Sequence, residues 1–65
     1  MIYDIYYYDD DDACIIIYNG ERCLIGGFNN LLHFVISKDW NYDDEKEAVV
    51  GPVLFQKLPS HKKNF

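Results

Sequence analysis

The sequence predicts an α+β fold in which a three-stranded antiparallel sheet is packed by one main helix. β-branched and aromatic residues concentrate in residues 2–8, 14–18 and 21–25, as they do in strands. The last two segments are joined by Asn19-Gly20, the strongest short signal for a two-residue hairpin turn. Apolar residues then recur at helical spacing over residues 28–40, which predicts the helix.

The first strand leads directly into an acidic loop. Side chains alternate between the two faces of a strand, so one face of residues 2–8 carries Tyr3, Ile5 and Tyr7, and the other carries Asp4, Tyr6 and Tyr8. The four aspartates Asp9–Asp12 follow. Adjacent carboxylates repel one another, and burying them unpaired would cost more free energy than a small fold can offset. The loop must therefore lie in water, on a metal ion or against a cationic partner.

The hairpin of residues 14–18 and 21–25 has a register that its turn fixes. With a two-residue loop, Tyr18 opposes Glu21, Ile16 opposes Cys23 and Ile15 opposes Leu24. Both faces are apolar, so we expect a central strand that is covered on at least one side. The two cysteines, Cys14 and Cys23, lie diagonally on one face, where Cβ atoms about 7 Å apart are too distant for an unstrained disulfide. We expect two reduced, buried thiols.

The helix begins after Gly26-Gly27, which ends the sheet. Asn29 or Asn30 is expected to cap its N-terminus. Its apolar stripe should pack on the sheet and consists of Phe28, Leu31, Leu32, Val35, Ile36 and Trp40, while His33, Ser37 and Lys38 point away. A strand over residues 32–36 is the competing interpretation, and whether Trp40 faces the core or a partner stays open.

Residues 43–50 are compatible with a short second helix. Its acids stand at the N-terminal end, where the helix dipole favours them, and Gly51-Pro52 would stop it. Residues 53–55 are expected to form a final short strand. The chain of 65 residues is long enough for one domain, over residues 1–58, and we expect residues 59–65 to be a basic tail.

Negative charge is concentrated in the first three quarters of the chain. Residues 1–47 hold eleven Asp and Glu against three Lys and Arg, a net charge of −8, whereas residues 48–65 hold three lysines and no acid. Such a surface repels nucleic acids and anionic membranes and attracts a basic protein. The sequence has neither a signal peptide nor an apolar stretch of about 20 residues, so we expect a soluble cytoplasmic protein.

The candidate partner-binding residues fall into two acidic clusters. Aromatic rings beside carboxylates suit the docking of Arg and Lys, through cation–π contacts and bidentate pairing, and we expect Tyr42 to be exposed for this purpose. The second cluster runs from Asp39 to Glu47. Together the clusters contain Asp9, Asp10, Asp11, Asp12, Asp39, Tyr42, Asp43, Asp44, Glu45 and Glu47.

Other chemistries lack the residue patterns that they need. The consecutive aspartates do not have the alternating ligands, glycine and distal Glu of a calcium loop. The spacing of Cys14, Cys23, His33 and His61 matches no zinc pattern. Nucleophile elbows and phosphate-binding loops do not occur. We therefore expect neither an enzyme nor a cofactor or metal.

Three segments together resemble small acidic inhibitors encoded by bacteriophages, especially anti-CRISPR proteins that block Cas9-type nucleases. The segments are CIIIYNGERCLI as a hairpin, FNNLLHFVISKDW as a helix and NYDDEKEA as an acidic stretch, over somewhat more than half of the chain. The chain departs from that pattern in beginning with a strand and in its aspartate loop. The resemblance implies a protein of the bacterial cytoplasm that imitates DNA phosphates and masks the basic, nucleic-acid-binding surface of a host defence protein such as a Cas nuclease.

Two other functions remain open from the residues. The tyrosines of residues 2–8, if they lie on an edge strand, would drive homodimerisation by sheet pairing, as in a structural or assembly module. A protein that binds a metal ion or a small molecule is the third alternative.

Overall fold

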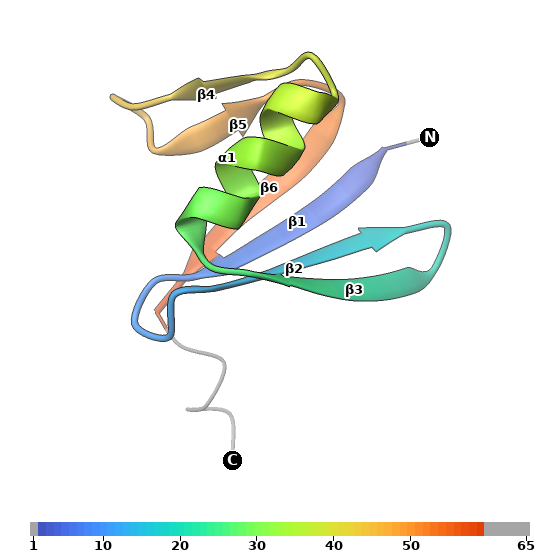
Figure 1. Cartoon of the computed structure of the whole chain (residues 1–65), viewed down its shortest axis with the longest axis horizontal. Coiled ribbons are helices and arrows are strands. Elements are labelled where there is room, and N and C mark those ends of the chain that lie inside the picture. The colour runs from blue at the N-terminus through green and yellow to red at the C-terminus, as the bar shows by residue number, and fades with distance from the viewer. Residues whose placement is uncertain (1, 60–65) are drawn as a thin grey trace.

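The computed structural model describes residues 2–59 and shows an α+β fold with one helix and six strands (Figure 1). Most of the predicted basic tail, residues 60–65, lies outside the described residues. In chain order the elements are β1 (Tyr3–Tyr8), β2 (Ala13–Tyr18), β3 (Glu21–Gly26), α1 (Phe28–Ser37), β4 (Asn41–Asp43), β5 (Ala48–Val50) and β6 (Val53–Leu58).

The β2–β3 hairpin has the register that the sequence predicts. Tyr18 pairs with Glu21, Ile16 with Cys23 and Ile15 with Leu24. Both turn residues have positive φ, 55° at Asn19 and 81° at Gly20, as a two-residue turn between twisted strands requires. The register shifts only at the far end of the hairpin, between Cys14 and Ile15.

The main sheet has four strands in the order β3-β2-β1-β6, not three. β1 and β2 are antiparallel, whereas β6 runs parallel to β1 with Tyr3 opposite Val53 and Tyr8 opposite Leu58. The predicted final strand is confirmed, and it is longer than expected. β1 pairs with β6 along one edge and with β2 along the other. The expectation that the tyrosine-rich strand lies at a sheet edge is therefore wrong. Its backbone groups are already paired and are not available to a second chain.

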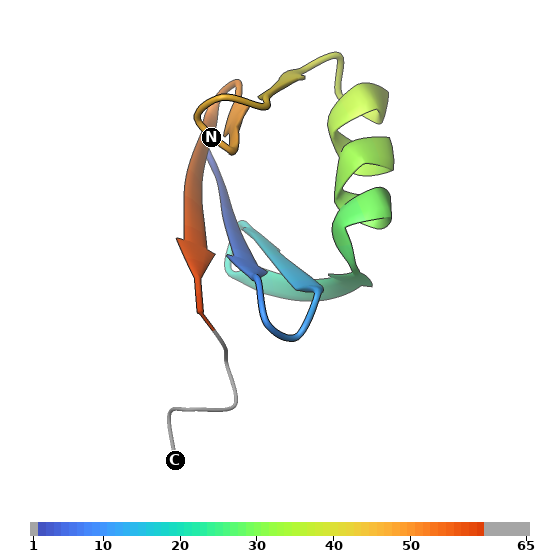
Figure 2. The same cartoon turned by 90° about the vertical axis from the view of Figure 1, so that its left-hand side faces the viewer.

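The helix α1 packs against one face of this sheet (Figure 2). The helix is confirmed and the alternative strand over residues 32–36 is wrong. Leu31 and Val35 of the predicted stripe are buried, but Ile36 is 73% exposed and does not pack on the sheet. The helix ends at Ser37 rather than at Trp40, because Asp39 takes a left-handed conformation with φ of 62°. The backbone N–H groups of Asp39 and Trp40 donate to the carbonyls of Ile36 and Val35, a Schellman termination that turns the chain back.

Residues 43–50 form a hairpin, so the second helix is a wrong prediction. The strands β4 and β5 pair antiparallel and are joined by a turn over residues 44–47. The Asp43 carboxylate accepts hydrogen bonds from the N–H groups of Glu45 and Lys46 at 3.0 and 3.2 Å. An acidic side chain that accepts hydrogen bonds from the next backbone amides stabilises a turn as well as the start of a helix. The same residues are therefore compatible with either structure, which explains the wrong prediction.

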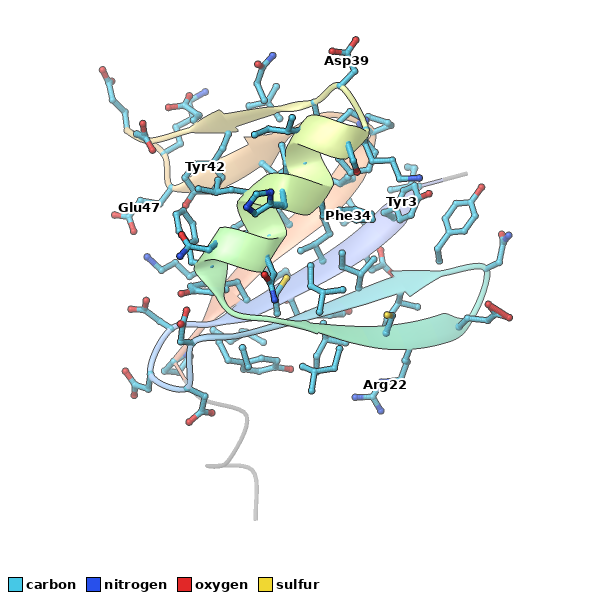
Figure 3. The ribbon with its side chains drawn as sticks, in the orientation of Figure 1. Tyr3, Arg22, Phe34, Asp39, Tyr42 and Glu47 are labelled. Carbon is cyan, nitrogen blue, oxygen red and sulfur yellow. The ribbon has the colours of Figure 1, made fainter. Side chains whose placement is uncertain are left out.

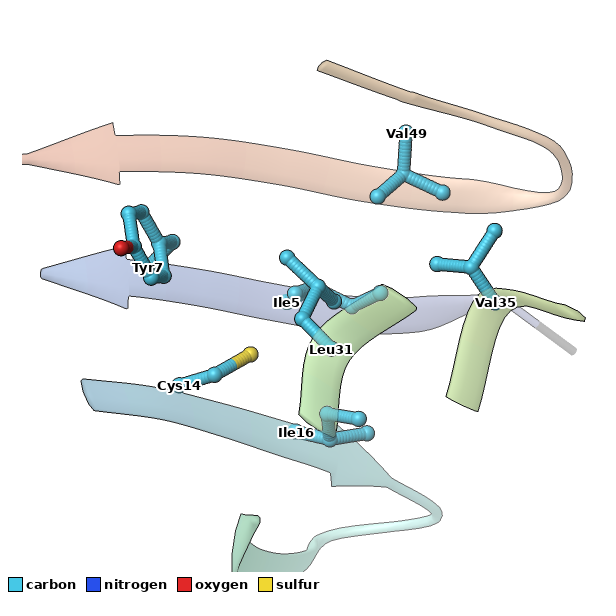
Figure 4. Close-up of a cluster of buried hydrophobic side chains, with 7 residues drawn as sticks. All are labelled: Ile5, Tyr7, Cys14, Ile16, Leu31, Val35 and Val49. Carbon is cyan, nitrogen blue, oxygen red and sulfur yellow. The ribbon is translucent and has the colours of Figure 1, made fainter. Parts of the chain in front are cut away.

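The core lies between α1, the main sheet and the β4–β5 hairpin (Figure 4). Its buried side chains are Ile5, Tyr7, Cys14, Ile16, Leu31, Val35 and Val49. Trp40 packs edge-on against the rings of Tyr3 and Phe34, with centroids 5.2 and 5.8 Å away, and so belongs to the core. Both cysteines are free thiols, but Cys23 is exposed rather than buried, because it lies on the edge strand β3.

Candidate protein-binding surface

The Asp9–Asp12 segment forms the turn between β1 and β2 and is held by backbone contacts to the end of β6. The N–H of Asp9 donates to the Leu58 carbonyl at 2.9 Å, and that of Asp10 donates to the Pro59 carbonyl at 3.0 Å. Asp9, Asp10 and Asp12 are exposed and Asp11 is half-buried. The turn therefore presents carboxylates on a fixed backbone at one end of the sheet.

Asp12 serves the fold rather than the outer surface alone. Its Oδ1 accepts the Tyr7 hydroxyl at 2.7 Å and the Phe28 N–H, at the first residue of α1, at 3.0 Å. These hydrogen bonds lower the pKa of Asp12. A Cβ on Gly27 would come within 2.5 Å of Asp12 Oδ2, so only glycine permits this approach.

The expected helix cap from Asn29 or Asn30 is wrong. The N-cap residue of α1 is Gly27, which has no capping side chain, and a free N–H at this end is satisfied by Asp12, sixteen residues away. Asn30 instead donates its Nδ2 to the Ile25 carbonyl at 2.6 Å. The side chain nearest in sequence is therefore not the one that caps this helix.

Lys57 on β6 joins the two acidic clusters. Its ammonium pairs with the Glu47 carboxylate and lies 3.9 Å from Asp9 Oδ1. The hydrogen bond to Glu47 is the main reason that the pKa of Lys57 is raised, and the same bond lowers the pKa of Glu47. The two acidic turns thus lie at the same end of the molecule, with Glu47 in the upper one (Figure 3).

We call residues 9–12 and 43–47 the acidic end. It contains eight carboxylates and, with Lys46 and Lys57, carries a net charge of −6, compared with −5 for the whole chain. The rest of the molecule is therefore close to neutral. Asp10, Asp44 and Glu45 are exposed, and among residues 2–59 their carboxylates have no hydrogen bond or ion pair. These three groups are the ones available to a partner.

Two of the predicted site residues do not belong to the acidic end's outer surface. Asp39 follows the C-terminal end of α1 (Figure 3), whereas Asp12 binds the first residue of the helix. Tyr42 is half-buried, not exposed, because its ring packs edge-on against Phe28 at 5.1 Å and Phe55 at 6.4 Å. Burial is also the main reason that the pKa of Tyr42 is raised. The expected aromatic platform for Arg and Lys is therefore absent at this position.

Sequence reasoning missed Lys57 as part of the site. It stands in the basic C-terminal part of the chain, and only the parallel pairing of β6 with β1 brings it beside Asp9. Alternation in residues 53–58 could have placed Lys57 on a strand, but nothing local indicates which strand it joins.

Within residues 2–59, no three His, Cys, Asp or Glu side chains are grouped to hold a metal ion. In the same part of the chain, no helix combines the length and the apolar character that crossing a membrane requires. An open hollow of about 190 Å³ lies between α1 and the β2–β3 hairpin and is mainly apolar. Comparison of the chain with protein family models, curated proteins and solved structures gives no match.

Proposed function

We propose that this chain is a small acidic protein that binds and masks a basic, nucleic-acid-binding surface of a host defence protein. The observation that supports the proposal is the meeting of both acidic turns at one end of the molecule, around Lys57. The two turns together with Lys57 carry a net charge of −6 and offer closely spaced carboxylates to lysines and arginines.

The mechanism that we propose is competition with DNA or RNA phosphates. A nucleic-acid-binding surface gains much of its affinity by neutralising phosphates with Lys and Arg. Asp10, Asp44 and Glu45 would pair with the same cations, and the folded turns hold them without further ordering cost. Such association is fast and weakens as salt screens the charges. A Cas9-type nuclease is the class of partner that the resemblance to anti-CRISPR proteins favours.

Several carboxylates of the acidic end already have contacts within the chain, which narrows the proposal. Asp12 binds Tyr7 and Phe28, and Asp43 stabilises its own turn. Asp9 and Glu47 share Lys57, but exposed pairs of this kind contribute little free energy and a stronger cationic partner can replace them. The proposal therefore assigns recognition first to Asp10, Asp44 and Glu45.

The test compares two charge-matched double variants. Asp10→Asn with Glu45→Gln removes two available carboxylates from the acidic end, whereas Glu21→Gln with Asp39→Asn removes one Glu and one Asp elsewhere. Each variant is titrated into guide-loaded Cas9-type nucleases, and DNA binding and cleavage are measured at several salt concentrations. We expect inhibition to weaken about tenfold in the first variant only, and to fall as salt rises.

Two results would contradict the proposal. Equal losses in both variants would show that only net charge matters, and inhibition that is insensitive to salt would exclude phosphate mimicry. Failure of every nuclease to bind the wild-type chain at low salt would exclude this class of partner.

A further inference from the structure

The main sheet has a second face that nothing in the described structure covers. Strand alternation directs Ile5, Tyr7 and Ile16 towards α1, so their neighbours along the strands point to the opposite side. α1 lies on one side of the sheet only (Figure 2). We call the uncovered side the open face; it consists of Asp4, Tyr6, Tyr8, Ile15, Ile17, Arg22, Leu24, Leu54, Gln56 and Leu58.

The open face is much more apolar than a water-facing sheet should be. Leu24 on β3 is 68% exposed and Leu54 on β6 is 58% exposed, and Ile15 and Ile17 on β2 are half-buried. One-sided antiparallel sheets normally place polar residues on the solvent side. Exposed apolar side chains gathered on one face of a sheet indicate a contact site.

The charges on this face indicate what covers it. Ile17 pairs with Asp4 on one side and with Arg22 on the other, so the two charged residues lie in one row, symmetrically about β2. Arg22 points away from α1 (Figure 3). Among residues 2–59, neither side chain has an ion-pair partner. A face with one acid and one base at equal distances from a central strand is complementary to itself.

We propose that two copies of the chain dimerise by packing their open faces together, with the two-fold axis running along β2. This axis sets Arg22 of each copy opposite Asp4 of the other, giving two reciprocal ion pairs, and stacks Ile15 and Ile17 on their own symmetry mates. Leu24 then meets Tyr6 of the other copy. This contact differs from strand-to-strand pairing, which the interior position of β1 excludes for that strand.

The size of the face predicts a weak dimer. With the axis along β2, the strands β3, β2 and β1 of one copy face β1, β2 and β3 of the other, and β6 lies outside the contact. Three strands spaced about 4.8 Å apart and about 20 Å long give a flat footprint of roughly 290 Å² per copy, below the usual size of a specific, stable interface. The axis also brings the two Asp9–Asp12 turns to the same end of the dimer, because it preserves the direction of β2. Their repulsion opposes association, which is a second reason to expect a weak dimer.

Sedimentation of the wild-type chain and of four variants tests the proposal. Leu24→Lys places a charge in the contact and should weaken the dimer at least tenfold. The matched control is Ile36→Lys, because Ile36 is 73% exposed on α1 and lies outside the open face, and it should dimerise like the wild type. Arg22→Asp should also weaken the dimer, and combining it with Asp4→Arg should restore it, since the swapped charges again oppose each other.

Three results would each overturn the proposal. The first is a wild-type chain that stays monomeric at about millimolar concentration, and the second is equal dimerisation of Leu24→Lys and Ile36→Lys. The third is a double swap that does not restore the dimer although circular dichroism shows that it is folded. Leu24 and Arg22 lie exposed on an edge strand, so their single variants should fold. The Asp10→Asn, Glu45→Gln variant should dimerise at least as well as the wild type, which keeps this test independent of the proposed inhibitory function.

Discussion

Asp10 and Asp12 stand two residues apart in the same turn and have different physical roles. Asp10 directs its carboxylate to solvent, whereas Asp12 accepts hydrogen bonds from Tyr7 and from the first residue of α1. A carboxylate at a helix N-terminus is favoured both by the free N–H groups and by the helix dipole. Part of the acidic run therefore stabilises the fold, and part remains for partners.

We predict that Asp12→Asn lowers the melting temperature by several degrees at neutral pH, while Asp10→Asn leaves it nearly unchanged. Because the folded-state pKa of Asp12 lies below the ordinary value of 3.8, its contribution is present above that value and is lost as pH falls through the folded pKa. The difference between wild type and Asp12→Asn should therefore close in acid. Thermal melts at pH 7, 5, 4 and 3 measure it, and a difference that is constant with pH would refute the role of the charge.

We also predict that the protein loses stability in alkali from about pH 9 upwards. Burial raises the pKa of the Cys14 thiol from 9.0 to about 12, and burial together with the hydrogen bond to Asp12 raises the pKa of Tyr7 above its ordinary 10.0. Both groups keep their protons in the folded state after the unfolded chain has lost them, so stability falls as pH rises through this range. Urea midpoints at pH 8–11 test this, and Tyr7→Phe should show the shallower decline.

At the scale of elements, the termination of α1 depends on a strained residue. Asp39 occupies the left-handed position that glycine usually fills at a helix end, and it brings a negative charge to the end where the dipole already disfavours one. The strain and the charge both oppose the native state. The sequence predicts Asp39 to be a partner-binding residue. In the structure its left-handed backbone conformation ends α1 instead.

We predict that Asp39→Gly stabilises the protein by about 1 kcal/mol, because glycine adopts positive φ without a Cβ clash. Chemical denaturation measures the change, and Asp39→Ala is the control, since it removes the charge but retains the strain. Stabilisation of equal size in both variants would show that the dipole, not the backbone, dominates. Binding to a basic partner should survive either substitution.

The elements that the sequence predicts correctly are those whose signals are local. Asn19-Gly20 fixes the register of β2–β3 because only one pairing fits a two-residue turn. The helix follows from its apolar period. The predicted helix over residues 43–50 is wrong because the Asp43 carboxylate can accept hydrogen bonds from the next backbone amides in either a helix or a turn. Only the pairing of β4 with β5 decides between the two.

For the whole molecule, the missing information is long-range. No local pattern states that β6 joins β1, and this one pairing changes the number of strands, moves the tyrosines from an edge to the interior and places Lys57 between the acidic turns. The clustering of charge at one end is thus a property of topology. The charge run itself is visible in the sequence, but the position of its counterion is not.

The stability of so small a molecule depends on few buried side chains. We predict that Leu31→Ala, at a fully buried position, costs about 2–5 kcal/mol, a large part of the roughly 3–10 kcal/mol expected for a chain of this length. Leu24→Ala, on the open face, should cost much less when measured on dilute protein. Denaturation curves compare the two, and a similar loss in both would mean that the open face is already covered by the molecule itself.

The parallel neighbours β1 and β6 also set the order in which the molecule can be built. Val53 lies opposite Tyr3, 50 positions earlier, so this ladder closes the longest loop of the described chain and carries the largest entropy cost. During translation β1 is synthesised before β6 and cannot pair with it until β6 has emerged. In that interval the backbone groups along one edge of this tyrosine-rich strand are unpaired. Slow synthesis of the segment that contains β6 would therefore leave the nascent chain prone to aggregation.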